Sequence, residues 1–458
     1  MLRRLLDAAV GAASRFVLGV FFRSVEVVGR DRLPRPPRIV VANHVNGLID
    51  PLFVFGTLRL PARTLGKSTL WRIPILRRLL DLAGVIPVYR PQDEGADPAR
   101  NRETFARSVE ELAGGATIAI FPEGISHDQP RLQPLRTGAA RIAIEAELER
   151  GPLGVAIVPV GLVFEERTLF RSRALVVVGE PLDPEPEVDL ARTDELGAAR
   201  ALTARIAAAL ERVTLNYRSW EEARWIETGA AIFERQGLEL PRARRLAAEF
   251  EVRRSLAAGL EALRERHPEE VAAAVEAIRD YDRLLATCGL RDEQVVARYP
   301  IGPTLYFVLR SLARMLLAAP IAAAGTLANA LPYLAVRAVA ARAAGGEPNQ
   351  VATYKVFPSL VAYPSTWGLE AALSGWLAGG WAALATLVAA PFAGLVAIRF
   401  LERSGNLWRE TRAYLLLRRR RKIAGELRAR RGEVERRTSV LVERWRELQP
   451  DGDSSSRA

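Results

Sequence analysis

Two stretches in the C-terminal third of this chain carry almost no charge. Met315–Val336 contains no Asp, Glu, Lys or Arg, and Val356–Ile398 contains only Glu370. A helix of ~20 apolar residues is long enough to cross a bilayer. Prolines within these stretches would kink such helices, which membranes tolerate. The sequence therefore predicts transmembrane helices over residues 301–402, with two or four crossings left open and a buried hairpin of a soluble core as the alternative.

The overall charge favours an anionic partner. The net charge of +12 suits anionic membrane lipid, phosphorylated substrates or an acidic carrier protein. No zinc knuckle or aromatic-rich RNA-binding signature is present, so nucleic acid is not expected. The single cysteine, Cys288, excludes an internal disulfide framework and a cysteine-based zinc site, and no metal is expected.

The remaining segments differ in composition. Residues 1–25 place apolar side chains at helical spacing among arginines, which predicts an amphipathic helix that associates with the membrane or packs on the protein's own core. Residues 216–300, rich in Ala, Leu, Arg and Glu, predict a helical linker domain. Residues 403–458 predict a basic helical tail, disordered at 450–458. The cluster Arg418–Lys422 follows the last apolar stretch, and the positive-inside rule places it in the cytoplasm.

Residues 26–215 alternate short apolar runs with helical stretches, as in an α/β domain. The expected strands are Ile39–Ala42, Val85–Tyr89, Thr117–Phe121, Val155–Val163 and Ala174–Val178. Open α/β sheets bind ligands at the carboxyl ends of their strands. The polar residues that follow these strands are therefore the candidates for chemistry.

His44 and Asp50 follow the first of these strands. A histidine can take a proton from a hydroxyl near neutral pH, and a carboxylate on its other ring nitrogen orients it. No serine or cysteine nucleophile stands beside the pair, which suits direct activation of a substrate hydroxyl. Two unrelated capping residues would explain the spacing equally well. Pairing also requires a non-helical turn, because residues i and i+6 point to nearly opposite sides of a helix, and Gly47 can supply that turn.

Two further segments contribute weaker signals. Glu123 and Gly124 follow a strand, and glycine there lets backbone N–H groups point toward an anion. Arg136 lies shortly downstream, and Arg90 ends another strand at the same expected edge of the sheet. Arginine suits bidentate binding of phosphate. The alternative is a strand-to-helix turn with solvated basic side chains.

Taken together and in order, four blocks resemble the glycerophospholipid acyltransferase family over roughly residues 20–215. They are Asn43–Asp50, Gly84–Arg90, Phe121–Gly124 and Ile157–Gly161. The run from Phe121 to Gly138 is similar to the fungal-type glycerol-3-phosphate/dihydroxyacetone-phosphate acyltransferases and their bacterial relatives. The sequence departs from the common family pattern in three ways. Five residues rather than four separate His44 from Asp50, Ser126 stands where the common form has arginine, and Arg136 replaces a lysine.

The resemblance implies an acyltransferase of phospholipid biosynthesis. The acyl group would pass from acyl-CoA or acyl carrier protein to a hydroxyl of glycerol 3-phosphate, dihydroxyacetone phosphate or lysophosphatidate, without a cofactor. His44 would act as general base with Asp50 orienting it. Arg90 and Arg136 would hold the phosphate. Glu123 would shape the loop or hydrogen-bond the glycerol, and amides around Gly124 would stabilise an oxyanion.

The resemblance also implies an enzyme integral to, or tightly bound to, a membrane, with its catalytic domain facing the cytoplasm, and the bacterial inner membrane is the expected location. The acyl donor, the acceptor, the chain length and the oligomeric state stay open. One alternative is a non-catalytic lipid-binding scaffold protein of the membrane. Another is a hydrolase that releases the acyl chain to water, although the sequence has no Gly-x-Ser-x-Gly elbow.

Overall fold

A computed structural model describes the chain apart from residues 73, 91–96, 235–244, 298–300, 346 and 449–458. The expected disorder at 450–458 therefore lies outside the described residues. The chain folds into two compact units. The first comprises Met1–Arg218 with two later segments, Leu240–Phe250 and Ala344–Thr353. The second comprises Ser219–Glu239, Glu251–Ala343 and Tyr354–Ala458.

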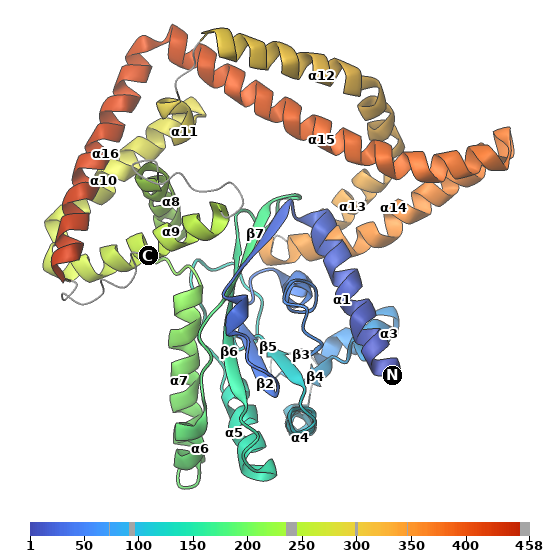
Figure 1. The fold of residues 1–458 in the computed structure, drawn as a ribbon, viewed down its shortest axis with the longest axis vertical. Helices are drawn as coiled ribbons and strands as arrows, with labels where there is room; N and C mark the ends of the chain where they lie inside the picture. Colours follow the sequence, from blue (N-terminus) through green and yellow to red (C-terminus); the bar gives the residue numbers. More distant parts are fainter. Residues whose placement is uncertain (73, 91–96, 235–244, 298–300, 346, 449–458) are drawn as a thin grey trace. The chain divides into compact units, whose positions relative to one another are not determined.

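A seven-stranded sheet lies at the centre of the first unit (Figure 1), in the order β1-β7-β6-β2-β5-β3-β4. Neighbouring strands are parallel except β6 and β7, which are antiparallel. This mixed sheet confirms the expected α/β domain. The strands are β1 (Ser24–Val28), β2 (Arg38–Ala42), β3 (Ala62–Lys67), β4 (Ile86–Val88), β5 (Thr117–Ile120), β6 (Ala156–Phe164) and β7 (Arg173–Val178).

Helices cover both faces of this sheet because alternate strand residues point to opposite sides. Ile39 and Val41 of β2 share a buried apolar core with three helices, α4 (Asn101–Ala113), α5 (Gly138–Arg150) and α7 (Glu195–Val213). On β6, Val163 belongs to that core, whereas its neighbour Phe164 packs against the rings of Phe22 and Phe53. The central strand β2 is thus buried along its length, and the residues that follow it are held from both sides.

Helix α1 (Leu2–Phe21) packs on the first unit's own core by one face, where Gly11, Ser14, Leu18 and Phe21 are buried. The packing is close, since a Cβ added to Gly56 would lie 2.9 Å from the backbone nitrogen of Arg15. Another stripe of the same helix stays exposed and apolar, with Leu2, Leu5, Phe16 and Val20. The helix is therefore part of the domain and still presents an apolar surface.

The second unit is entirely helical over its described residues. Its core includes buried side chains of α10 and α16, and Asp292 ties the two together by accepting hydrogen bonds from Tyr281 at 2.6 Å and Arg431 at 2.8 Å. The expected linker and the expected basic tail thus pack on each other. The helices from here to the end of the chain are α8 (Trp220–Glu234), α9 (Arg245–Arg266), α10 (Pro268–Cys288), α11 (Asp292–Val296), α12 (Ile301–Ala328), α13 (Ala330–Ala343), α14 (Pro348–Ala378), α15 (Gly380–Arg419) and α16 (Arg421–Leu448).

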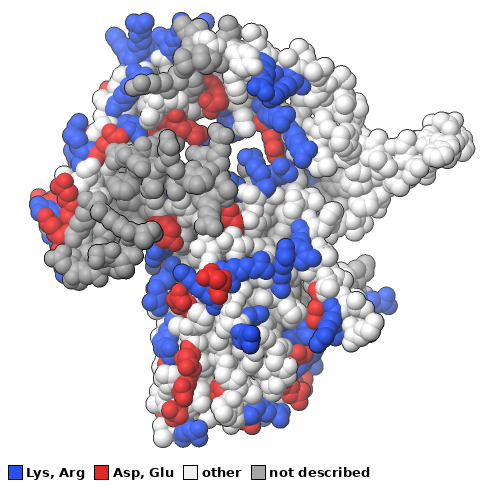
Figure 2. Space-filling model, in the orientation of Figure 1, with Lys and Arg blue, Asp and Glu red and all other residues white. Residues whose placement is uncertain are grey.

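Among the described residues, two segments are long and apolar enough to cross a membrane, Tyr306–Ala328 in α12 and Gly380–Arg419, which is α15. Few of their residues are buried within the protein. The helices break at Asn329 and Gly379, inside the two stretches of very low charge in the sequence. At the second break α14 turns into α15, and this apolar hairpin forms the white projection in Figure 2, where no Lys, Arg, Asp or Glu is visible.

Candidate active site

The segment Asn43–Asp50 begins where β2 ends, next to β6. Asn43 continues the pairing of the two strands through its side chain, which donates a hydrogen bond to the carbonyl of Leu162 at 3.0 Å and accepts one from its amide at 2.7 Å. The chain then leaves the sheet, and Gly47 adopts a φ of +53°. A short 3-10 turn, Gly47–Ile49, leads into a helical turn at Asp50. The turn at Gly47 expected from the sequence is present.

This turn brings His44 and Asp50 into contact. The Nδ1 of His44 lies 2.9 Å from Oδ2 of Asp50. The Asp50 side chain is fully buried, whereas that of His44 is 20% exposed, and the His44 ring stacks on Phe121 with 4.5 Å between ring centroids. A buried carboxylate on Nδ1 selects the tautomer in which Nε2 is free to accept a proton. The pair has the geometry that a general base requires.

Four side chains hold the backbone amides of this loop. Glu123 accepts from His44 N–H at 2.8 Å and Asp50 from Asn46 N–H at 2.7 Å. Ser126 and Thr353 accept from the next two amides along the chain, Gly47 and Leu48, each at 3.1 Å. Buried amides need such partners when no strand or helix pairs them. The place of the imidazole is therefore set by these four acceptors.

Glu123 is 2% exposed, and protein groups engage both of its carboxylate oxygens. Besides the amide of His44, it accepts from the amide of Gln133 at 2.8 Å and makes a close contact with Nε2 of His127. This arrangement is that of a residue that shapes the loop. The loop-shaping role expected for Glu123 has its contacts here, and a hydrogen bond from glycerol to this carboxylate stays a prediction.

Arg90 and Arg136 both approach Gly124. An Nη1–H of Arg90 donates to the carbonyl of Gly124 at 2.6 Å, and Cγ of Arg136 lies 3.4 Å from where a Cβ of Gly124 would stand. The Arg136 side chain is exposed. The Gly124 amide donates to the carbonyl of Phe121 at 3.0 Å, so it is not available to an oxyanion. The structure thus brings all six expected residues into one cluster of contacts around the His44 loop and Gly124.

Several residues of this cluster escaped the sequence analysis. Arg167, between β6 and β7, forms an ion pair with Asp128 at 2.6 Å and donates to the carbonyl of Val45 at 3.4 Å. From the start of α14, Thr353 contacts the loop and Asn349 contacts Ser126 beside it. A lone arginine or asparagine far along the chain carries no spacing signal. Within the described part of the chain, no group of three His, Cys, Asp or Glu side chains could hold a metal ion.

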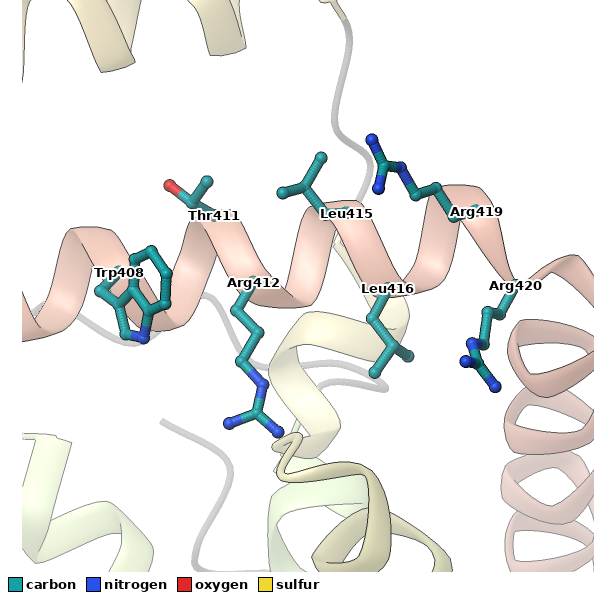
Figure 3. Close-up of a pocket in the computed structure, with 7 residues that line it drawn as sticks. All are labelled: Trp408, Thr411, Arg412, Leu415, Leu416, Arg419 and Arg420. Atoms are coloured by element: carbon teal, nitrogen blue, oxygen red, sulfur yellow. The ribbon is translucent and has the colours of Figure 1, made fainter.

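A pocket also lies on α15 of the helical unit (Figure 3). Its lining combines Trp408 with three arginines, Arg412, Arg419 and Arg420, and with Thr411, Leu415 and Leu416. The pocket contains none of the residues expected to carry chemistry. An aromatic residue followed by basic ones at the end of an apolar helix is typical of the headgroup layer of a membrane.

Two parts of the chain are similar to known acyltransferases. Residues 24–163 match the acyltransferase family model, and residues 232–450 match the model of the glycerol-3-phosphate acyltransferase 2 C-terminal domain. Glycerol-3-phosphate O-acyltransferase 2 of Saccharomyces cerevisiae is 30% identical over 44% of this chain and 26% of its own length. A chloroplastic 1-acyl-sn-glycerol-3-phosphate acyltransferase of Arabidopsis thaliana is 28% identical over 31% of this chain and 36% of its own length.

A crystal structure of the 1-acyl-sn-glycerophosphate acyltransferase of Thermotoga maritima is 19% identical, with a TM-score of 0.35, over 46% of this chain and 79% of that one. The match to the yeast relative covers only about a quarter of that relative's length. The two family models lie side by side along this chain, on the α/β domain and on most of the helical region. Residues 24–163 form an acyltransferase domain, and the chain belongs to the glycerophospholipid acyltransferase family.

Proposed function

We propose that this protein transfers a fatty acyl group from an acyl thioester to a hydroxyl of glycerol 3-phosphate. The contact between His44 Nδ1 and the buried Asp50 carboxylate at 2.9 Å carries this proposal. It leaves Nε2 as the atom that accepts the hydroxyl proton. Asp50 keeps the ring in place and stabilises the imidazolium that forms.

The reaction then needs no protein nucleophile. The deprotonated hydroxyl oxygen attacks the thioester carbonyl and forms a C–O bond. Collapse of the tetrahedral intermediate breaks the C–S bond, and the proton held on Nε2 passes to the departing thiolate. General acid–base catalysis of this kind contributes about 10²–10⁴-fold to the rate.

Arg90 and Arg136 are proposed to bind the phosphate of the acceptor. Arg90 donates a hydrogen bond to the carbonyl of Gly124, and its planar guanidinium carries five N–H donors in all. Arg136 is exposed beside the same glycine. Two guanidinium groups near one loop suit a dianionic phosphate. Arg136 also takes the place of the lysine expected from the family pattern.

The choice of glycerol 3-phosphate rests on the relatives. The C-terminal model carries the name of a glycerol-3-phosphate acyltransferase and matches residues 232–450, and the yeast relative named for that reaction matches at 30% identity. Other relatives are named for acylation of 1-acyl-sn-glycerol 3-phosphate. Lysophosphatidate and dihydroxyacetone phosphate are therefore the acceptors to compare with it.

The test is an acceptor panel with the purified full-length protein. A radiolabelled acyl-CoA and the same acyl chain on acyl carrier protein would each be offered with the three acceptors and with water alone. The proposal expects labelled lysophosphatidate from glycerol 3-phosphate at the highest kcat/KM. Free fatty acid without an acceptor would indicate a hydrolase, and lipid binding without transfer from any donor would indicate a scaffold protein.

We further propose that the protein is held in a membrane by α12 and α15, with the α/β domain in the cytoplasm. These helices expose apolar side chains along most of their length, which water would not favour. The basic cluster Arg418–Lys422 supports a cytoplasmic end. The exposed stripe of α1 adds an apolar surface to the catalytic unit. Resistance to extraction at alkaline pH would support this location, and full release would contradict it.

A further inference from the structure

A segment from the C-terminal part of the sequence belongs to the catalytic unit. Ala344–Thr353, which includes the first residues of α14, is part of the first unit. Asn349 and Thr353 are 3% and 6% exposed, although both are polar. Burial of polar side chains is unfavourable unless they form hydrogen bonds. The hydrogen-bond partners of Asn349 and Thr353 therefore indicate what these two side chains do.

Both partners lie in or beside the loop that carries His44. The Thr353 hydroxyl oxygen accepts a hydrogen bond from Leu48 N–H at 3.1 Å, across 305 residues of sequence. Asn349 donates from Nδ2 to the carbonyl oxygen of Ser126 at 2.9 Å and to its hydroxyl oxygen at 3.2 Å. That hydroxyl in turn accepts from Gly47 N–H at 3.1 Å. Two successive amides of the loop thus depend on the start of α14, one directly and one through Ser126.

The loop is also fitted closely against this segment. A Cβ added to Gly47 would lie 2.6 Å from Oγ1 of Thr353 and 3.1 Å from the carbonyl oxygen of Asn349. Gly47 and Leu48 lie between His44 and Asp50, whose side chains pair at 2.9 Å. A shift of Gly47 and Leu48 would therefore move the carboxylate relative to the imidazole. The rigidity of this pair depends on residues that are distant in sequence.

We propose that Thr353 and Asn349 are positioning residues that complete the active site by fixing the His44–Asp50 loop. This inference rests on the proposed function, because it assigns them an effect through the base of that reaction. Neither residue touches the reacting atoms in this role. A displacement of about 1 Å in a catalytic group can cost about 100-fold in rate, so the loss of one held amide is expected to appear in kcat.

The experiment compares three threonine variants of the full-length protein in membranes. T353V removes the acceptor for Leu48 N–H at nearly constant volume, and T353S retains a hydroxyl. The matched control is T366V in the same helix, since the Thr366 hydroxyl donates to the carbonyl of Ala362 within that helix, at 2.8 Å. T353V should lower kcat about 10- to 100-fold with KM for glycerol 3-phosphate changed little. T353S should recover most of the rate, and T366V should match the wild type. N349A, which loses the contacts with Ser126, should behave like T353V.

A second experiment distinguishes a purely structural role from an effect exerted through His44. The activities of T353V and N349A are measured again in an H44A background. If these residues act through His44, neither substitution should lower the residual rate of H44A further. Equal losses in both backgrounds would overturn the inference, as would a T353V protein as active as T366V while H44A is inactive. An H44A protein of wild-type activity would instead contradict the proposed function itself, and with it any role exerted through His44. If T353V does not accumulate, N349A provides the same comparison.

Discussion

Glu123 accepts a hydrogen bond from the backbone amide of His44 at 2.8 Å, across 79 residues of sequence. The same carboxylate contacts His127 and the amide of Gln133. It therefore links the turn after β5 to the loop after β2 from a buried position. Glu123, which follows Phe121 and Pro122, is thus part of the structure that supports His44.

Replacement of Glu123 by alanine should destabilise the catalytic unit. The change would leave two backbone amides and the buried His127 without their acceptor. Removal of one partner from a buried pair typically costs about 3–5 kcal/mol. Thermal unfolding of E123A and E103A in the same detergent would test this, because Glu103 lies on the exposed side of α4. Equal melting temperatures for the two variants would show that Glu123 has no structural role.

Gly47 should tolerate no side chain. Its φ of +53° is strained for other residues, and a Cβ there would lie 2.6 Å from Oγ1 of Thr353. We expect G47A to lose about 100-fold in kcat/KM, since the His44 loop must shift by a good part of 1 Å. The comparison is G19A, because Gly19 is exposed in α1 with nothing within 4 Å of its added Cβ. Similar activities of G47A and G19A would refute the tight fit.

The acid sensitivity of the fold should depend in part on Glu165. Burial alone would raise the pKa of Glu165, but the hydrogen bonds and charge of Arg173 outweigh it and lower the pKa below its usual 4.5. A carboxyl with a lowered folded pKa contributes stability above its unfolded pKa, and this contribution is lost as the pH falls through the folded pKa. E165Q should therefore melt below the wild type at pH 7, and this difference should be smaller at a pH well below 4.5. A constant difference at both pH values would exclude this linkage.

Asn329 should stabilise the helical unit. It lies between α12 and α13, accepts from Nε1 of Trp367 at 2.9 Å and donates to the carbonyl of Ala390 at 3.3 Å, so it contacts both α14 and α15. Hydrogen bonds between packed helices are worth about 1 kcal/mol each. N329A should unfold at a lower temperature or a lower denaturant concentration than N406A. N406A is the control because Asn406 is exposed on α15. Identical unfolding of the two variants would contradict this assignment.

Much of the α/β domain could be predicted from apolar runs, as with Ile39–Ala42 and Thr117–Phe121, because buried central strands are continuously apolar. Two strands were missed for a physical reason. β1 (Ser24–Val28) contains Glu26 and is only partly buried, and β3 (Ala62–Lys67) buries only the small Ala62 and Thr64, with Arg63 between them. Neither pattern stands out from a loop.

Candidate site residues could be predicted from the sequence where they follow a strand within a few positions, as His44 and Asp50 do. The roles of Thr353 and Asn349 could not be predicted, because only the fold brings them near the loop. Their sequence context is that of an ordinary helix start. The same holds for Arg167. The Gly124 amide was expected to face an anion, and its bond to Phe121 depends on turn geometry that residue types do not specify.

The most direct test of the account is the rate of acyl transfer to glycerol 3-phosphate by H44A, with H267A as the histidine control. His267 caps α10 in the helical region and contacts Glu270 at 3.8 Å. The account predicts that H44A loses about 10²–10⁴-fold in kcat while remaining folded and membrane-bound, and that H267A keeps wild-type activity. Transfer by H44A within a few-fold of the wild-type rate would contradict it.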